Sequence, residues 1–185
     1  MSIELDLTAI ADRIRARDTS AEPDPRAAVA AVLRPGPDIL FIRRAEHPKD
    51  PWSGHMAFPG GRRDPTDDSL EHTARRETFE EVGLDLGQGQ LLGPLDDMPT
   101  FAGGLVVRPY VWLVEDPRPL TPNHEVSAVS WTSLSTLESG AHDTTYPLQW
   151  KGQHHEFPGY DVGPGIVWGL TYRMLHALFE TLRTG

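Results

Sequence analysis

The sequence predicts an α/β sandwich, in which helices pack on a β-sheet. Two observations support this prediction. Short apolar runs separated by glycine and proline recur through the middle of the chain, and segments with helical spacing stand at its start, middle and end. A length of 185 residues with 38% hydrophobic residues suits one domain with a sizeable core.

The first helical segment covers residues 7–17, where Leu7, Ile10 and Ile14 share one face. A stretch rich in proline and acidic residues follows and indicates a linker. We therefore expect an N-terminal helix and linker over residues 1–24 and a main domain over residues 25–185. The N-terminal helix could also take part in a homodimer.

Within the main domain, apolar runs bounded by turn residues predict strands, and longer periodic segments predict helices. The expected strands cover 27–33, 39–42, 55–58, 91–95, 105–114 and 126–131, with weaker patterns at 146–150 and 155–157. The expected helices cover 69–82, 132–137 and 166–182.

Composition excludes several classes of protein and of site. A net charge of −10 argues against a nucleic-acid binder that works by neutralising phosphates. There is no cysteine, so a metal would have to bind through oxygen or imidazole. No apolar run approaches a membrane span and the start does not resemble a signal peptide, so we expect a cytoplasmic protein without a membrane partner. A phosphorylated small molecule stays possible, because a bound cation can supply positive charge locally.

The residues that say most about function lie in the predicted central helix, residues 69–82. At 100° per residue, Glu77 and Glu81 fall on the same stripe as Leu70 and Ala74, and Glu80 flanks them. Like charges at this spacing repel each other. A hard divalent cation such as Mg²⁺ prefers oxygen ligands and would compensate this repulsion.

Two other features of this helix need an interpretation. Phe79 and Val82 lie towards its opposite side, so we expect packing partners on both faces. For a bare pattern of three glutamates, the alternative is a solvated acidic face. The context favours a site, because Gly60 and Gly61 precede the helix and Arg76 stands one turn before Glu80.

The run from Gly61 through Arg76-Glu77-Thr78-Phe79-Glu80-Glu81-Val82-Gly83-Leu84 resembles the Nudix box. It departs from the usual pattern in its spacing, since fourteen residues separate Gly61 from Arg76, one more than is common, and in Thr78, which replaces an aliphatic residue. Asp67 or Asp68 stands where the first glutamate is usual. Asp68 has a competing role as the helix N-cap, paired with Glu71.

The resemblance implies an α/β/α sandwich around a mixed sheet, with Mg²⁺ or Mn²⁺ as cofactor. It also implies attack of water on a diphosphate within a nucleotide-like small molecule. By this resemblance, the metal ligands would be Glu77, Glu80, Glu81 and the carbonyl of Gly60. The catalytic residues would be Glu77, Glu80, Arg76 and Glu125. Of these, Arg76 would orient a glutamate, and Glu125 resembles the acid ahead of the family's tryptophan strand. For Glu125 the alternative is a surface turn acid, and His124 is a weaker candidate acid or base.

Three segments resemble the subfamily that cleaves coenzyme A to 3′,5′-ADP and 4′-phosphopantetheine. They are residues 40–45, residues 54–61 and the run Trp168-Gly169-Leu170-Thr171, although Ile42 and Ala45 depart from the usual threonine and serine. The lengthened box and the pair Asp67 and Asp68 are shared with this subfamily. Candidate substrate-binding residues are Arg43, Arg44, Arg62 and Gly61, with Arg63 as a further phosphate contact; each arginine has the alternative of a solvated or salt-bridged surface residue.

The sequence also allows other activities. Within enzymes, the alternative substrates are ADP-ribose, dinucleoside polyphosphates and noncanonical nucleoside triphosphates. From another class, the chain could be a non-catalytic nucleotide-binding sensor, although all three box glutamates are intact.

Overall fold

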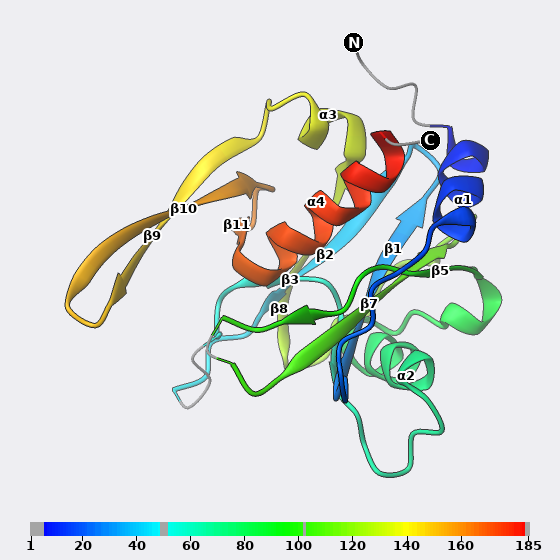
Figure 1. Cartoon of the computed structure of the whole chain (residues 1–185), viewed down its shortest axis with the longest axis horizontal. Coiled ribbons are helices and arrows are strands. Elements are labelled where there is room, and N and C mark those ends of the chain that lie inside the picture. Colours follow the sequence, from blue (N-terminus) through cyan, green and yellow to red (C-terminus); the bar gives the residue numbers. More distant parts are fainter. Residues whose placement is uncertain (1–5, 49–51, 102, 184–185) are drawn as a thin grey trace.

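The computed structural model describes residues 6–48, 52–101 and 103–183 and contains one large mixed sheet (Figure 1). The sheet runs in the order β3-β2-β1-β7-β5, and β4, β6 and β8 pair with β1, β7 and β2. Only β1 and β7 are parallel among these pairs. The strands are β1 (Ala27–Arg34), β2 (Asp38–Arg44), β3 (Met56–Ala57), β4 (Gly60–Arg62), β5 (Gln90–Pro94), β6 (Met98–Pro99), β7 (Val106–Leu113) and β8 (Val126–Ser133).

Helices cover both faces of this sheet, which confirms the predicted α/β class (Figure 1). On one face lies α2 (Leu70–Val82), and on the other lie α1 (Leu7–Ala16) and α4 (Gly169–Arg183). Residues of β1 alternate between the two cores, with Ala30 and Val32 facing α2 and Ala31 and Leu33 facing α4. A strand that is buried on both sides needs a continuous apolar run, as residues 27–33 have.

The strands β1 and β2 diverge, and this divergence makes room for the site. They pair with each other only at the two residue pairs beside their turn. Beyond that point, β3 pairs with β2 while β4 pairs with β1. Residues 56–62 therefore fill the gap between the two strands, and β4 packs against α2.

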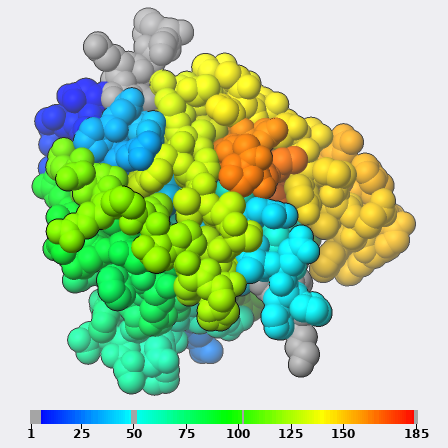
Figure 2. Space-filling view, turned by 180° about the vertical axis from the view of Figure 1, so that it is seen from behind, coloured from blue at the N-terminus to red at the C-terminus, as the bar shows by residue number. Residues whose placement is uncertain are grey.

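A second, antiparallel sheet contains β9 (Asp143–Trp150), β10 (Gln153–Asp161) and β11 (Ile166–Trp168). Its hairpin of β9 and β10 projects from the body, and Figure 2 shows the projection from behind. The short helix α3 (Leu134–Glu138) connects the two sheets. The base of the second sheet contacts β3 through β11.

The expected start of the last helix is wrong. Residues 166–168 form β11 and pair with β10, which buries Val167. The helix begins at Gly169, whose φ of 61° lies in the left-handed region that favours glycine. The sequence also did not predict β4, β6 and the 3₁₀ helix η1 (Leu86–Gln88), because two or three residues are too few for a periodic pattern.

The N-terminal helix α1 packs onto the main domain. Its Ile10 and Ile14 are buried in the same core as α4. The stretch after α1 is tied down as well, since the backbone N–H groups of Ser20 and Glu22 donate to Asp96 and Asp97. Among the helices of the described ranges, none combines the length and apolar character needed to cross a bilayer.

This packing predicts a large effect of Ile14→Ala. The substitution leaves a cavity between α1 and the core, so the free energy of unfolding should fall by about 2–4 kcal/mol in urea denaturation. The exposed Arg15→Ala on the same helix is the control and should change it by less than about 0.5 kcal/mol. Equal values for the two variants would show that α1 does not stabilise the domain.

Candidate functional site

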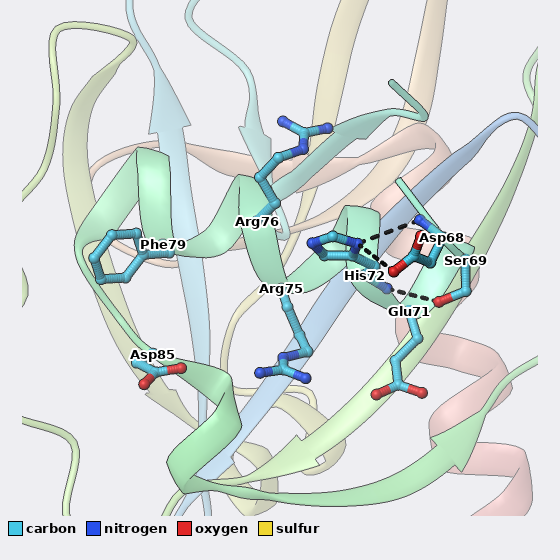
Figure 3. Close-up of a pocket in the computed structure, with 8 residues that line it drawn as sticks. All are labelled: Asp68, Ser69, Glu71, His72, Arg75, Arg76, Phe79 and Asp85. Carbon is cyan, nitrogen blue, oxygen red and sulfur yellow. Dashed lines mark hydrogen bonds and ion pairs between the residues drawn. The ribbon is translucent and has the colours of Figure 1, made fainter. Parts of the chain in front are cut away.

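The ends of α2 are set by two capping residues. Ser69 has extended backbone and its hydroxyl accepts from the N–H of His72 at 3.1 Å, as Figure 3 shows. At the other end, Gly83 has φ of 70° and its N–H donates to the carbonyl of Phe79. The expectation that Asp68 is the N-cap is therefore wrong, because Ser69 occupies that position and Asp68 is exposed.

The side of α2 that faces the sheet carries small residues and one carboxylate. Ala74 and Thr78 are fully buried, and the hydroxyl of Thr78 donates to the carbonyl of Ala74 at 2.7 Å. This intrahelical bond satisfies the polar group that replaces the usual aliphatic residue. Val82 is buried, but Phe79 is 59% exposed on the outer side, so the expectation of a packing partner for Phe79 is wrong (Figure 3).

Glu81 is 3% exposed and contacts the backbone of β4. The N–H of Gly60 donates to Glu81 Oε2 at 2.9 Å. Gly60 lies opposite Val29 in the pairing of β4 with β1. The backbone groups of its two neighbours in the chain point towards β1, so its own N–H points away from β1 and is available to α2. A Cβ on Gly60 would lie 2.3 Å from the carbonyl oxygen of Ala28, so only glycine fits here.

Glu77 approaches the next glycine, Gly61. A Cβ on Gly61 would lie 2.5 Å from the carboxyl group of Glu77. Two carboxylates of α2, those of Glu77 and Glu81, therefore lie close to the backbone of β4. The absence of a side chain at Gly61 allows the approach of Glu77, and the absence of one at Gly60 allows the close approach of β1.

Burial raises the pKa of both carboxyl groups. For Glu81, burial raises the pKa from its ordinary value of 4.5 to about 8, although the Gly60 N–H and the charge of Arg44 act against this rise. The pKa of Glu77 is raised mainly by burial, and Arg76 opposes the shift. The charge of Glu125 raises the pKa of both groups as well. Burial and the neighbouring carboxylates therefore both disfavour the charged forms of Glu77 and Glu81.

Arg76 contacts three carboxylates. Its Nε donates to Asp67 Oδ1 at 2.9 Å and its Nη2 to Asp67 Oδ2 at 3.0 Å, a two-point ion pair. The same guanidinium lies 3.1 Å from Glu77 Oε1 and 3.1 Å from Glu80 Oε2. Arg76 thereby holds Glu77 and Glu80 in position.

Asp67 anchors this network from a buried position. It also accepts from the hydroxyl of Thr73 at 2.8 Å and the N–H of Asp64 at 2.9 Å. The Arg76 guanidinium holds the pKa of Asp67 far below its usual range. Of the two aspartates considered for the first box position, Asp67 is the one that pairs with Arg76.

The two remaining candidates, Glu125 and His124, lie just before β8. The carbonyl of Glu125 accepts from the N–H of Ala45 at 2.7 Å, which places Glu125 beside the end of β2. Its carboxylate acts on Glu77 and Glu81 through its charge. His124 is exposed, and its Nε2 lies 3.8 Å from Glu125 Oε1.

The four candidate arginines have different surroundings. On β2, Leu40 and Ile42 face α2 while Phe41 faces α4, so alternation turns Arg44 towards α2 and Arg43 towards the opposite face. Arg43 donates to the carbonyl of Gly54, and Arg63 donates to the carbonyls of Asp67 and Asp68. Arg62 is exposed on β4.

The comparisons with known proteins agree with this arrangement. The NUDIX domain family matches residues 24–151. This chain belongs to the Nudix hydrolase family. It is 32% identical over 153 residues to the uncharacterized Nudix hydrolase NudL of Photorhabdus laumondii, covering 82% of this chain and 81% of that protein. It is 33% identical over 165 residues to NudL of Yersinia pestis strain Pestoides F, covering 82% and 76%.

Solved structures share the Nudix fold. The NUDIX domain of Shewanella oneidensis NrtR, in complex with ADP ribose, has a TM-score of 0.54 at 18% identity and covers 97% of this chain and 94% of that chain. A bifunctional NMN adenylyltransferase/ADP ribose pyrophosphatase of Francisella tularensis, in complex with AMP and an Mn ion, has a TM-score of 0.55 at 15% identity and covers 95% and 47%. At these identities the likeness concerns the fold alone.

The Nudix site fits a hard divalent cation by the chemistry of its donors. Its groups are oxygen donors, and two of them are carboxylates with raised pKa values beside the backbone of β4. Within residues 6–48, 52–101 and 103–183, no three acidic or histidine side chains are already grouped as a complete metal site. The carboxylate of Glu80 forms an ion pair with Arg76 on the more exposed side of the helix.

Sequence reasoning left open which aspartate pairs with Arg76 and did not anticipate the role of Thr73. The loop from Asp64 to Ser69 offers several acidic and hydroxyl groups, and the helical period of α2 does not extend into it. One signal was available, since Thr73 lies on the same helix face as Arg76, three residues earlier. The conformation of the loop backbone places Asp67 within reach of both Thr73 and Arg76.

The raised pKa of Glu81 predicts how stability depends on pH without metal. Between pH 4.5 and about 8 the folded chain binds more protons than the unfolded chain, so the free energy of unfolding should fall as the pH rises through this range. Glu81→Gln removes the ionisation and should stabilise the metal-free protein at pH 8 by on the order of 3 kcal/mol. Chemical denaturation in EDTA measures this difference.

The wild type and the Glu81→Gln variant at low pH provide the control. At pH 4, below both pKa values, the Gln variant and the wild type should have similar stability. A gain that is equal at pH 4 and pH 8 would contradict the raised pKa, because it could not arise from ionisation.

Proposed function

We propose that this Nudix protein is a Mg²⁺- or Mn²⁺-dependent hydrolase of a diphosphate bond in a nucleoside diphosphate linked to another group, with coenzyme A as the substrate. The products from coenzyme A are 3′,5′-ADP and 4′-phosphopantetheine. The observation that carries the hydrolase proposal is the pair Glu77 and Glu81, which the fold buries against Gly60 and Gly61 although their charges are only partly neutralised.

Partly compensated buried carboxylates are costly unless a cation binds them. The ligand set of the proposal is Glu77, Glu80, Glu81 and the Gly60 carbonyl. A bound divalent cation supplies charge neutralisation of the diphosphate and a water of lowered pKa. Arg76 positions Glu77 and Glu80 by its ion pairs, and Asp67 holds Arg76.

Other residues of the site would act on water and substrate. Glu125 is proposed as the base that accepts a proton from the attacking water, because its charge already reaches Glu77 and Glu81. Arg44 and Arg62 are proposed to contact phosphate oxygens, and Gly61 lets the substrate approach the backbone of β4.

The choice of coenzyme A is supported by contacts between the three segments that resemble that subfamily. The N–H of Arg44 donates to the carbonyl of His55 at 3.0 Å, and the N–H of Gly54 donates to the carbonyl of Arg44 at 3.1 Å. The ring of His55 lies 5.0 Å from that of Trp168. Segments far apart in the sequence thus meet beside the candidate site, as parts of one recognition surface should.

Glu80→Gln tests the metal role. The variant should lose at least about 100-fold in turnover, because it loses one of the proposed ligands, while its far-ultraviolet circular dichroism and melting temperature stay near those of the wild type. Glu71→Gln, in the first turn of the same helix, is the matched control and should keep wild-type turnover. A Glu80→Gln variant that turns over at the wild-type rate would refute the ligand assignment.

Product identification in ¹⁸O-labelled water tests the substrate. With Mg²⁺ and coenzyme A, mass spectrometry should find 3′,5′-ADP and 4′-phosphopantetheine, with the label on the phosphorus that water attacks. ADP-ribose, a dinucleoside polyphosphate and a noncanonical nucleoside triphosphate serve as comparison substrates. Cleavage of ADP-ribose without cleavage of coenzyme A would overturn the substrate assignment, and binding without any turnover would favour a sensor.

A further inference from the structure

A buried threonine lies on the same side of α2 as the charged residues of the site. Thr73 precedes Arg76, Glu77 and Glu80 by three, four and seven residues, so these side chains follow one another over successive turns. The proposed function uses the three charged residues. Thr73 is neutral and fully buried, and that function gives it no part. The helix thus places a buried hydroxyl beside the charged network.

The hydroxyl of Thr73 has two acceptors within reach. It lies 2.8 Å from Asp67 Oδ2 and 3.2 Å from the carbonyl oxygen of Ser69. A hydroxyl has one proton to donate, and a hydrogen bond to a carboxylate is shorter and stronger than one to a neutral carbonyl. The proton of Thr73 therefore goes to Asp67.

Thr78 provides a comparison on the same helix. Its side chain is as buried as that of Thr73, and its hydroxyl donates to the carbonyl of Ala74, four residues earlier, at 2.7 Å. Such a bond is common for threonine within a helix. Thr73 has its shorter contact with Asp67, and this contact joins the helix to the loop before it.

The bond from Thr73 fixes Asp67 more firmly than the bonds from Arg76 can. Threonine is branched at Cβ and has one stiff side-chain torsion, whereas the long arginine side chain has many rotamers. The N–H of Asp64 donates to the same carboxylate oxygen as Thr73, at 2.9 Å. Two rigid donors, one in the loop and one on the helix, therefore set the orientation of the Asp67 carboxylate.

The orientation of this carboxylate determines that of the Arg76 guanidinium. The pair has two contacts, at 2.9 and 3.0 Å, so rotation of either group disrupts both. The same guanidinium contacts Glu77 Oε1 and Glu80 Oε2, each at 3.1 Å. A change in the position of Asp67 is therefore passed on to both glutamates.

We propose that Thr73 is a positioning residue of the metal site. Its hydroxyl fixes the carboxylate of Asp67, which in turn fixes the guanidinium of Arg76. Through that guanidinium, Thr73 sets how tightly Glu77 and Glu80 hold a divalent cation. The inference rests on the proposed function, because that function makes these two glutamates ligands.

Binding of Mn²⁺ without substrate, measured by electron paramagnetic resonance, tests this proposal. Thr73→Val keeps the shape of the side chain and removes the hydroxyl, so the dissociation constant for Mn²⁺ should rise by about 5- to 20-fold. Thr73→Ala also removes the hydroxyl and should give a similar rise, whereas Thr73→Ser keeps it and should retain wild-type affinity. Thr78→Val makes the same change at an equally buried position and is the matched control, which should also retain wild-type affinity.

Exchange of the Arg76 Nε–H with water, measured by nitrogen-15 NMR in EDTA, tests the route without metal. In the wild type this N–H donates to Asp67 Oδ1 and should exchange slowly. Thr73→Val should speed the exchange by about 5-fold or more, and Thr73→Ser should not. The Nε–H of Arg108 donates to the buried Asp97 at 2.7 Å in a similar two-point pair, and its exchange should be unchanged in every variant.

The outcomes separate this proposal from the proposed function. Wild-type Mn²⁺ affinity and wild-type Arg76 exchange in Thr73→Val and Thr73→Ala would overturn the positioning role, even where the protein hydrolyses a diphosphate. If the wild type hydrolyses no diphosphate but both variants weaken Mn²⁺ binding and speed the Arg76 exchange, the hydrolase proposal fails and the positioning role stands.

Two other results would also contradict the positioning role. Weaker Mn²⁺ binding with unchanged exchange at Arg76 would mean that the effect does not pass through the guanidinium. Equal weakening of Mn²⁺ binding by Thr78→Val would indicate a general effect of the substitution on packing.

Discussion

The site depends on the close approach of α2 to the backbone of β4. The carboxylate of Glu77 occupies the space that a side chain at Gly61 would take, and the carboxylate of Glu81 accepts from the N–H of Gly60. The approach buries acidic groups that a helix would ordinarily expose, which is why their pKa values rise. Backbone geometry thus creates the electrostatic condition that favours a bound cation.

Arg76 and Asp67 make this acidic arrangement compatible with a folded chain. Asp67 is buried and saturated with donors, so it stays ionised and fixes the guanidinium from the loop side. The guanidinium also forms ion pairs with the carboxylates of Glu77 and Glu80 on α2. One arginine therefore reduces the repulsion between glutamates and sets the direction of their side chains.

The divergence of β1 and β2 connects this site to the second sheet. Because residues 56–62 fill the gap between the strands, the chain just before them, including His55, reaches the rings of Trp168 and Tyr146. The same short segment carries Gly60 against α2. A single loop and two short strands therefore connect α2 to the second sheet.

The sequence by itself determined the class of the fold, most of the elements and the acidic face of α2. These follow from local rules, since a buried strand needs a continuous apolar run and a helix places residues 77 and 81 on one stripe. The residues from Arg76 to Leu84 were enough to indicate the family. The capping residue of α2 was misjudged, because aspartate and serine are both good caps and stand side by side there.

Only the tertiary structure decided the interactions between distant segments. It selected Asp67 as the partner of Arg76, and it made residues 166–168 a strand by pairing them with β10. The ring contacts of Phe101 with Trp150 and of Tyr146 with Trp168 likewise join separate regions of the chain. Local periodicity cannot carry such information, because these contacts depend on how the chain returns to itself.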